Sequence, residues 1–133
     1  MTTPLNGQII GQAAIATRAL LTRLLDQHHL TFEQSVALRQ AATSGRAAPE
    51  AVASGLRISA AKAAATVSVL VERGLLDPDG HLTPPGTTLF TELDAETAAI
   101  TARLYGDLPA NDLHIAGRVL AEVTARANDE LSS

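Results

Sequence analysis

Apolar residues recur every three to four positions in the first and last parts of the chain, which is typical of amphipathic helices. The first such stretch covers residues 5–27. The others fall within residues 87–130, where a break at residues 106–109 separates two helices. A chain of 133 residues has little else on which to bury three apolar helix faces, so we expect two copies to pair through them.

Residues 31–86 are divided into shorter elements by capping and turn residues. Thr31 and Gln34 have the spacing of a capping box, which predicts a helix from there to about residue 43. Pro49 suits the first turn of a short helix that ends near residue 55. The sequence therefore predicts two helices joined by a brief connection.

An alanine-rich helix and a hairpin follow. Ser59 is a suitable N-cap for this helix, and Gly74 suits the position just past its end. The Asp-Pro-Asp-Gly segment at residues 77–80 predicts a tight turn between two short strands. Three helices followed by a hairpin form a winged helix-turn-helix, whose recognition helix enters the major groove of DNA. We therefore predict a mainly α fold with a short β-hairpin wing.

Composition narrows the class of protein. The chain is 46% hydrophobic but only 2% aromatic, so its core must be aliphatic. It has no cysteine, which excludes thiolate metal sites and thiol-based redox sensing. We find no apolar run of the roughly 18 residues that span a membrane and no signal peptide, so we expect a cytoplasmic protein without membrane attachment.

The net charge of −4 is unevenly distributed along the chain. Acidic residues outnumber basic ones after residue 84, whereas the two balance over residues 31–83. A nucleic-acid surface is therefore expected in the middle of the chain. The balance also predicts few phosphate contacts and a moderate salt dependence of DNA binding.

The alanine-rich helix carries the candidates for base contacts. Lys62, the only lysine, is predicted on its outer face, where it would reach a base or a phosphate; alternatively it only adds solubility. The hydroxyl groups of Ser59 and Thr66 offer hydrogen bonds, although Ser59 as a helix cap alone is an equally good interpretation. Ala60 and Ala61 offer methyl groups that fit against thymine methyls.

Basic residues around this helix are candidates for phosphate contacts. Arg46 precedes the short helix, Arg57 lies in the turn, and Arg73 lies at the exit of the alanine-rich helix. Arg73 has an alternative partner in Asp77. His81 lies in the predicted wing, where its protonated form would offset the acidic residues of the turn.

No catalytic or metal site is predicted. His28 and His29 are adjacent, and neighbouring side chains on a helix point about 100° apart, so they rarely bind one ion together. The chain has no nucleophile elbow, phosphate loop or dinucleotide fingerprint. We therefore expect no metal, no cofactor and no enzymatic activity.

The order of these elements resembles the multiple-antibiotic-resistance regulator (MarR) family. Four motifs carry the resemblance along nearly the whole chain: Leu30-Thr31 with Gln34 and Leu38, Ile58-Ser59, Leu70-x-x-Arg73-Gly74-Leu75, and Leu82-Thr83-x-x-Gly86. The resemblance implies a homodimer joined by the first and last two helices, and a pseudo-palindromic double-stranded DNA operator. It also implies a site for a small aromatic or phenolic ligand between the dimer helices and the DNA-binding lobe.

Together these expectations form one hypothesis, a homodimeric and ligand-responsive repressor. It has a single MarR-like domain over residues 1–133, with a winged-helix lobe at about 31–86 and dimerisation helices at about 5–27 and 87–130. The predicted wall of the ligand pocket is Leu21, Leu25, His28 and Phe32, although core packing explains them equally well. The alternative hypothesis is a winged-helix dimer with weak or lost DNA binding, which serves as a protein-interaction or ligand-binding module.

Overall fold

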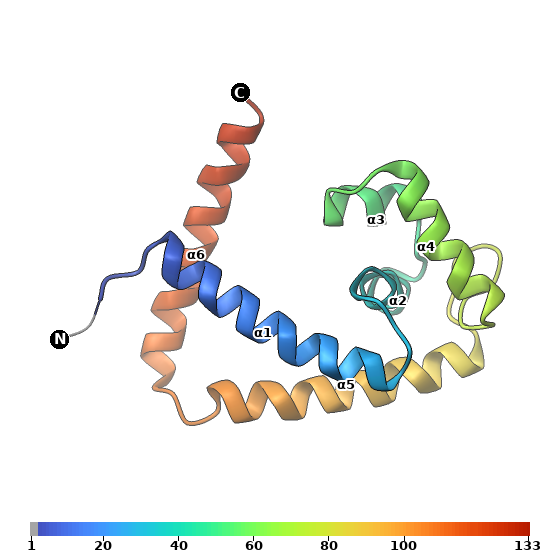
Figure 1. Ribbon diagram of the computed structural model, residues 1–133, viewed down its shortest axis with the longest axis horizontal. Coiled ribbons are helices and arrows are strands. Elements are labelled where there is room, and N and C mark those ends of the chain that lie inside the picture. The colour runs from blue at the N-terminus through green and yellow to red at the C-terminus, as the bar shows by residue number, and fades with distance from the viewer. Residues whose placement is uncertain (1–2) are drawn as a thin grey trace. The chain divides into compact units, whose positions relative to one another are not determined.

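The computed structural model of this protein describes residues 3–133, and the fold over this range is mainly α, as predicted. The helices, labelled in Figure 1, are α1 (Gly7–Gln27), α2 (Phe32–Ser44), α3 (Pro49–Leu56), α4 (Ala60–Glu72), α5 (Pro84–Tyr105) and α6 (Ala110–Leu131). The alanine-rich recognition helix of the sequence prediction is α4. None of the helices in the described range is long and apolar enough to cross a membrane.

The chain divides into two compact units, Met1–Thr97 and Ala98–Ser133. The first contains α1 to α4 and most of α5, and therefore the whole predicted winged-helix lobe. The second contains the end of α5 and all of α6. The organisation of residues 1–133 as one domain stays a prediction.

An aliphatic core holds the first unit together. Each of α1 to α4 contributes one fully buried large side chain, and the segment after α4 contributes another: Leu25, Leu38, Val52, Leu70 and Leu76. Burial of such a side chain stabilises a fold by roughly 1.5–3 kcal/mol. Because α4 packs against both α2 and α3, this core fixes the position of the recognition helix.

The predicted helix ends are confirmed. Gln34 and Thr31 form both hydrogen bonds of a capping box, at 3.0 and 3.1 Å, at the start of α2. Gly45 ends α2 in the left-handed conformation with φ of 88°, and Pro49 occupies the first turn of α3. Short-range signals in the sequence therefore define this part of the fold.

The predicted β-hairpin wing is the main correction. In the described range, Leu76 and Leu82 form an isolated antiparallel bridge, and no strand extends from it. The tight turn at residues 77–80 is present, with Gly80 at φ of 89° and its N–H donating to the Asp77 carbonyl at 2.9 Å. A longer ladder is prevented because Pro84 begins α5 immediately after the bridge, and α4 ends just before it.

The start of α5 is fixed against the end of α4. The Thr83 hydroxyl donates to the Gly74 carbonyl oxygen and accepts the Gly86 N–H at 3.1 Å. A Cβ atom at Gly86 would overlap the backbone carbonyl of Leu75. Glycine is thus required here by a close approach of two backbone segments.

In the second unit Ile100 is half-buried and every other residue is exposed. Large apolar side chains of α6 form the exposed set Leu113, Ile115, Val119, Leu120, Val123 and Leu131. The residues Leu113, Leu120 and Val123 belong to the stripe that the sequence predicts for one face of this helix. Nothing within residues 98–133 covers this face.

Candidate nucleic-acid interface and ligand cavity

The recognition helix α4 is buried along one side only. Ala63, Val67 and Leu70 face the core, with 0%, 9% and 0% of their surfaces exposed. The Ser59 hydroxyl caps the helix by accepting the Lys62 N–H at 3.1 Å, as the sequence predicts. The opposite side of α4 is open to solvent.

The candidate base contacts lie at the start of α4. Ala60, Ala61 and Lys62 are exposed, and the Lys62 ammonium forms no ion pair within the described range. Thr66 is half-buried, and its hydroxyl donates to the Lys62 carbonyl at 2.9 Å. Thr66 therefore has its hydroxyl proton engaged, whereas the other side chains are accessible.

Two of the candidate arginines bind backbone carbonyls. Arg46 Nε donates to the carbonyl oxygen of Asp79 at 2.8 Å, which ties the loop between α2 and α3 to the 77–80 turn. Arg73 Nη1 donates to the carbonyl of His29 at 2.8 Å, and Nη2 donates to that of His28 at 3.3 Å. The alternative pairing of Arg73 with Asp77 is not formed.

Arg57 ends α3 and lies in the turn before α4. Its backbone has φ of 55° and ψ of 45°, the left-handed conformation that costs most residues energy. The residue is exposed and lies beside the start of α4, and its contact with a phosphate stays a prediction.

The 77–80 turn carries a stabilised negative charge. The backbone N–H of His81 donates to Asp77 Oδ1 at 2.9 Å, and the N–H of Asp79 donates to the same oxygen at 2.9 Å. The first of these bonds is the main reason that the pKa of Asp77 lies below its ordinary value of 3.8. His81 Nδ1 lies 3.3 Å from Asp77 Oδ2, so the histidine faces this carboxylate. Close approach of the turn to a phosphate is therefore opposed by Asp77.

The same turn contains the one group of residues in the described range that could approach a cation together. Ligand atoms of Asp77, Asp79 and His81 lie within 4.8 Å of one another. One carboxylate oxygen of Asp77 already accepts two backbone N–H groups, which leaves less of it for a metal. The arrangement is explained by the turn itself.

A cavity of 320 Å³ lies in the first unit. Its lining residues come from α1, α2 and α5, and they are Leu21, Phe32, Ser35, Val36, Arg39, Leu93 and Thr97. This volume is in the range of small-molecule sites, and the lining is mostly apolar with a single charged group.

The cavity includes two of the four residues predicted for its wall, Leu21 and Phe32. Leu25 is instead a core residue with 1% of its surface exposed, because α1 turns it toward α2. His28 lies outside the lining, and its Nε2 is 2.9 Å from Glu96 Oε1 on α5. Core packing thus explains Leu25, and a hydrogen bond with Glu96 on α5 explains His28.

Sequence reasoning missed the charged residue of this cavity. Arg39 lies with its guanidinium carbon 5.3 Å from the centre of the Phe90 ring and Nη2 3.4 Å from Asp94 Oδ1. Its two partners, Phe90 and Asp94, lie on α5, more than 50 positions away in the sequence. A second cation, Arg18 on α1, lies 4.3 Å from the centre of the Phe32 ring. The one feature of the sequence that could have indicated this residue is that it is the only arginine in α2.

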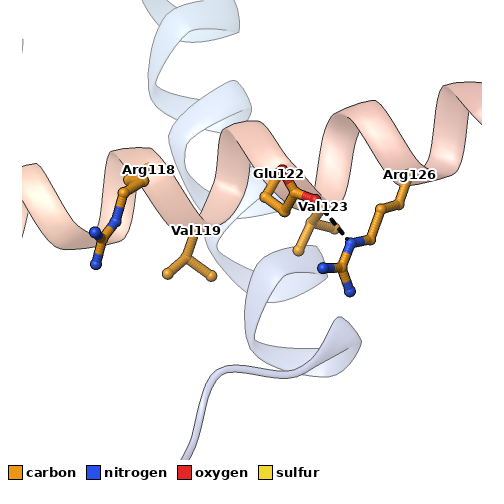
Figure 2. Close-up of a pocket in the computed structure, with 5 residues that line it drawn as sticks. All are labelled: Arg118, Val119, Glu122, Val123 and Arg126. Atoms are coloured by element: carbon orange, nitrogen blue, oxygen red, sulfur yellow. Dashed lines mark hydrogen bonds and ion pairs between the residues drawn. The ribbon is translucent and has the colours of Figure 1, made fainter.

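A second pocket, of about 440 Å³, lies along α6 in the other unit. Figure 2 shows its lining side chains on one side of this helix: Arg118, Val119, Glu122, Val123 and Arg126. Arg126 Nε donates to Glu122 Oε1 at 2.9 Å, one helical turn away. The apolar lining of this pocket consists of Val119 and Val123, which are exposed residues of α6. The pocket is therefore part of the uncovered surface of this helix.

The chain matches a family of known proteins. The profile described as the helix-turn-helix family matches residues 21–131, which is most of the chain. No curated protein matches the sequence. The matched range contains α2 to α6 completely, and so includes the recognition helix and the residues around it.

Solved structures share the fold. The Mycobacterium tuberculosis MarR family protein Rv2887 in complex with DNA is 21% identical, with 92% of this chain and 98% of that chain covered and a TM-score of 0.75. The complex of the same protein with salicylic acid is also 21% identical, with 92% and 99% covered and a TM-score of 0.71. CouR from Rhodococcus jostii RHA1 bound to p-coumaroyl-CoA is 19% identical, with 88% and 90% covered and a TM-score of 0.74.

Structures with this fold also include the transcriptional regulator PA3341 and a MarR family transcriptional regulator from Rhodococcus sp. RHA1. At these identities the comparisons establish the fold. They agree with the order of elements that the sequence predicts, from the first long helix to the last.

Proposed function

This chain belongs to the helix-turn-helix family and has the fold of MarR-type winged-helix regulators, and on this basis we propose that it is a cytoplasmic, sequence-specific DNA-binding regulator. The observation that carries the proposal is the recognition helix α4, which is anchored on one side and open on the other. A helix held in this way is what major-groove binding requires.

The start of α4 is proposed to meet the bases. Ser59, Ala60, Ala61, Lys62 and Thr66 lie in its first two turns. Lys62 is the cation among them, and its exposed side chain suits a phosphate or a guanine edge. Ser59 serves two roles, because a helix N-terminus with its cap also contacts phosphates.

The surrounding basic residues are proposed to contact the DNA backbone. Arg57 stands in the turn before α4. Arg46 and Arg73 first position the elements that meet DNA, and their remaining N–H donors contact phosphates. His81 contributes when it is protonated, although Asp77 lies beside it. Because each subunit has few cations near the DNA, the affinity for DNA should depend only moderately on the salt concentration.

Dimerisation is proposed through α1, α5 and α6. The exposed apolar side chains of α6 find no cover within their own unit, and a second copy would supply it. Each copy in a two-fold symmetric dimer would contribute one α4 helix. Half-sites of a pseudo-palindromic operator would then lie about 34 Å apart, one turn of DNA.

The cavity between α1, α2 and α5 is proposed to bind a small aromatic or phenolic anion. Its apolar lining suits a ring, and Arg39 suits a carboxylate or phenolate. Complexes of proteins with the same fold contain salicylic acid and p-coumaroyl-CoA, which supports this ligand class. Binding would shift the dimer toward a form with a different spacing of its α4 helices, so the regulator acts as a ligand-released repressor.

One observation favours a second candidate function, a winged-helix dimer that has lost DNA binding. The outer side of α4 has a single cation, Lys62, and the nearby turn keeps the charge of Asp77. Arg46 and Arg73 also bind carbonyl groups of their own chain. Such a module would still use the cavity or the apolar helices to bind a ligand or a protein.

Fluorescence anisotropy decides between these functions. Full-length protein is titrated into labelled DNA from the region upstream of its own gene, and into a scrambled duplex, at two salt concentrations. Tighter binding to the native fragment, weakened moderately by salt, is the expected result. Equal and feeble binding to both duplexes, and to fragments from the rest of the genome, would support the second candidate.

A further inference from the structure

The part of α4 that faces outward most directly is made of very small side chains. Ala61, Ala65 and Ser68 follow one another at helical spacing, opposite the buried row of Ala63, Val67 and Leu70, and all three are exposed. Ala64, beside this row, is exposed as well. Ala64 thus lies at one edge of this face and Lys62 at the opposite edge, with Ala61 and Ala65 between them.

This surface lacks the side chains that read purines by paired hydrogen bonds. Guanine is usually read by arginine or lysine, and adenine by asparagine or glutamine. Helix α4 contains no arginine, asparagine or glutamine, and its charged residues are Lys62 and Glu72. Glu72 lies at the last position of the helix, about 10 Å along the axis from Ala65. The central face can therefore offer methyl groups and one hydroxyl.

The methyl group of thymine is the complementary feature in the major groove. It is the one apolar group that a base pair presents there, and alanine makes apolar contact with it. Small side chains also let a helix backbone approach the base edges closely, because the groove is about 12 Å wide and a helix with its side chains is about as wide.

We infer that Ala61 and Ala65 read thymine methyl groups, so that each operator half-site carries T·A pairs where it faces the centre of α4. The inference rests on the proposed DNA-binding function. The sequence specificity then comes from apolar contacts at the centre of the α4 face, and Lys62 contacts the DNA at the edge of this face. Most of the sequence preference would then be insensitive to salt, since no ion pair carries it.

The first experiment uses the unaltered protein. Duplexes that bind are selected from a random-sequence library, and conserved thymines in their half-sites are replaced by deoxyuridine, which removes only the C5-methyl group. Affinity measured by anisotropy is expected to fall about fourfold for each methyl lost, and about 15-fold for a symmetric pair of replacements. The matched control places the same number of deoxyuridines in the flanks, where we expect no change.

A protein variant tests the same contact from the other side. Ala65→Gly removes the methyl contact from both half-sites of a homodimer, so it should weaken binding to the thymine duplex about 15-fold. It should change binding to the duplex with deoxyuridine in both half-sites little, because the methyl partner is already absent. Ala42→Gly, at an exposed position of α2, carries the same penalty in helix propensity and serves as the control. The deoxyuridine experiment decides the question even where a glycine variant folds poorly.

The outcomes separate this inference from the proposed function. Selected half-sites that lack T·A pairs, or that bind equally well with deoxyuridine, would overturn the methyl readout and leave a sequence-specific regulator. If the library yields no preferred sequence at all, the proposed DNA-binding function fails, and the inference fails with it.

Discussion

Arg73 Nη1 donates to the carbonyl oxygen of His29 over 2.8 Å, which joins the end of α4 to the end of α1. His29 has φ of 57°, a left-handed conformation that costs a non-glycine residue energy and is held here by its surroundings. On the other side of this junction, His28 Nε2 lies 2.9 Å from Glu96 Oε1 on α5. Three helices of the first unit thus meet at the end of α1.

Replacing Arg73 separates its structural role from a DNA contact. Arg73→Ala should lower the free energy of unfolding by about 1 kcal/mol, because two charge-assisted but exposed hydrogen bonds are lost. Arg73→Lys should lose much of the same stability, since one ammonium group cannot reproduce the two bonds, yet it keeps the charge. Urea denaturation measures both.

The salt dependence of DNA binding tests the phosphate contact of Arg73. The slope of log affinity against log salt should fall by about 1 per subunit in Arg73→Ala and stay unchanged in Arg73→Lys. Lys62→Ala is the comparison variant, with a similar loss of slope and unchanged stability because its side chain is exposed. An Arg73→Ala variant with the full slope would limit this residue to holding α1 and α4 together.

Gly86 is predicted to be sensitive to a single methyl group. Gly86→Ala should lower the free energy of unfolding by about 1–3 kcal/mol, because the new Cβ would overlap the backbone carbonyl of Leu75. Gly55→Ala in α3 is the control, since its Cβ would make an ordinary contact at 3.6 Å, and we expect it to stabilise the helix by about 0.5 kcal/mol. Thermal melts of the two variants that move in the same direction would contradict this.

Asp77 is predicted to contribute stability that depends on pH. Its pKa is lowered in the folded chain, chiefly by the His81 N–H, so the stabilisation is present above the ordinary value of 3.8 and is lost as the pH falls through the folded-state pKa. Asp77→Asn should therefore reduce the difference in melting temperature between pH 6 and pH 3. Carboxyl NMR titration of the unaltered chain gives the pKa directly, and a value at or above 3.8 would refute the assignment.

Arg39 is predicted to hold the anionic group of a ligand in the cavity. Arg39→Leu should weaken salicylate binding about tenfold or more in isothermal titration calorimetry, because a charge-assisted hydrogen bond is lost. Arg23→Leu changes charge equally at an exposed position of α1 outside the cavity lining, and it should bind salicylate as before. Equal loss in both variants would point to a general effect of net charge.

The apolar face of α6 is predicted to form the dimer interface. Leu120→Glu places a charge among exposed apolar residues and should shift the chain toward the monomer in sedimentation velocity experiments. Ala125→Glu lies on the opposite side of the same helix and should leave the oligomeric state unchanged. A Leu120→Glu variant that sediments like the parent would remove α6 from the interface.

Signals within a few residues were enough to predict most of the helices. Thr31 with Gln34, Pro49 and Ser59 each satisfies or tolerates free backbone groups at a helix start, so they mark where helices begin. Gly74 adopts the positive φ that its place after α4 requires, 75°. These positions depend on the local backbone alone, which is why the sequence reveals them.

The wing was predicted less well because a strand needs a partner. The Asp-Pro-Asp-Gly turn at residues 77–80 forms as expected, but the length of its flanking ladder depends on where α4 ends and α5 begins. The segment between these two helix boundaries is long enough for only one antiparallel bridge, between Leu76 and Leu82. A turn is a local property, whereas a hairpin is a property of the two segments that it joins.

By itself, the sequence determined the order of the helices, their caps, the aliphatic core and the small, nearly uncharged face of the recognition helix. Only the tertiary structure decided which groups the side chains meet. It turned Leu25 into the core, gave Arg73 the carbonyl of His29 instead of Asp77, and brought Leu93 and Thr97 to the cavity. The physical reason is distance along the chain: capping and periodicity act over a few residues, while these contacts join segments that only packing brings together.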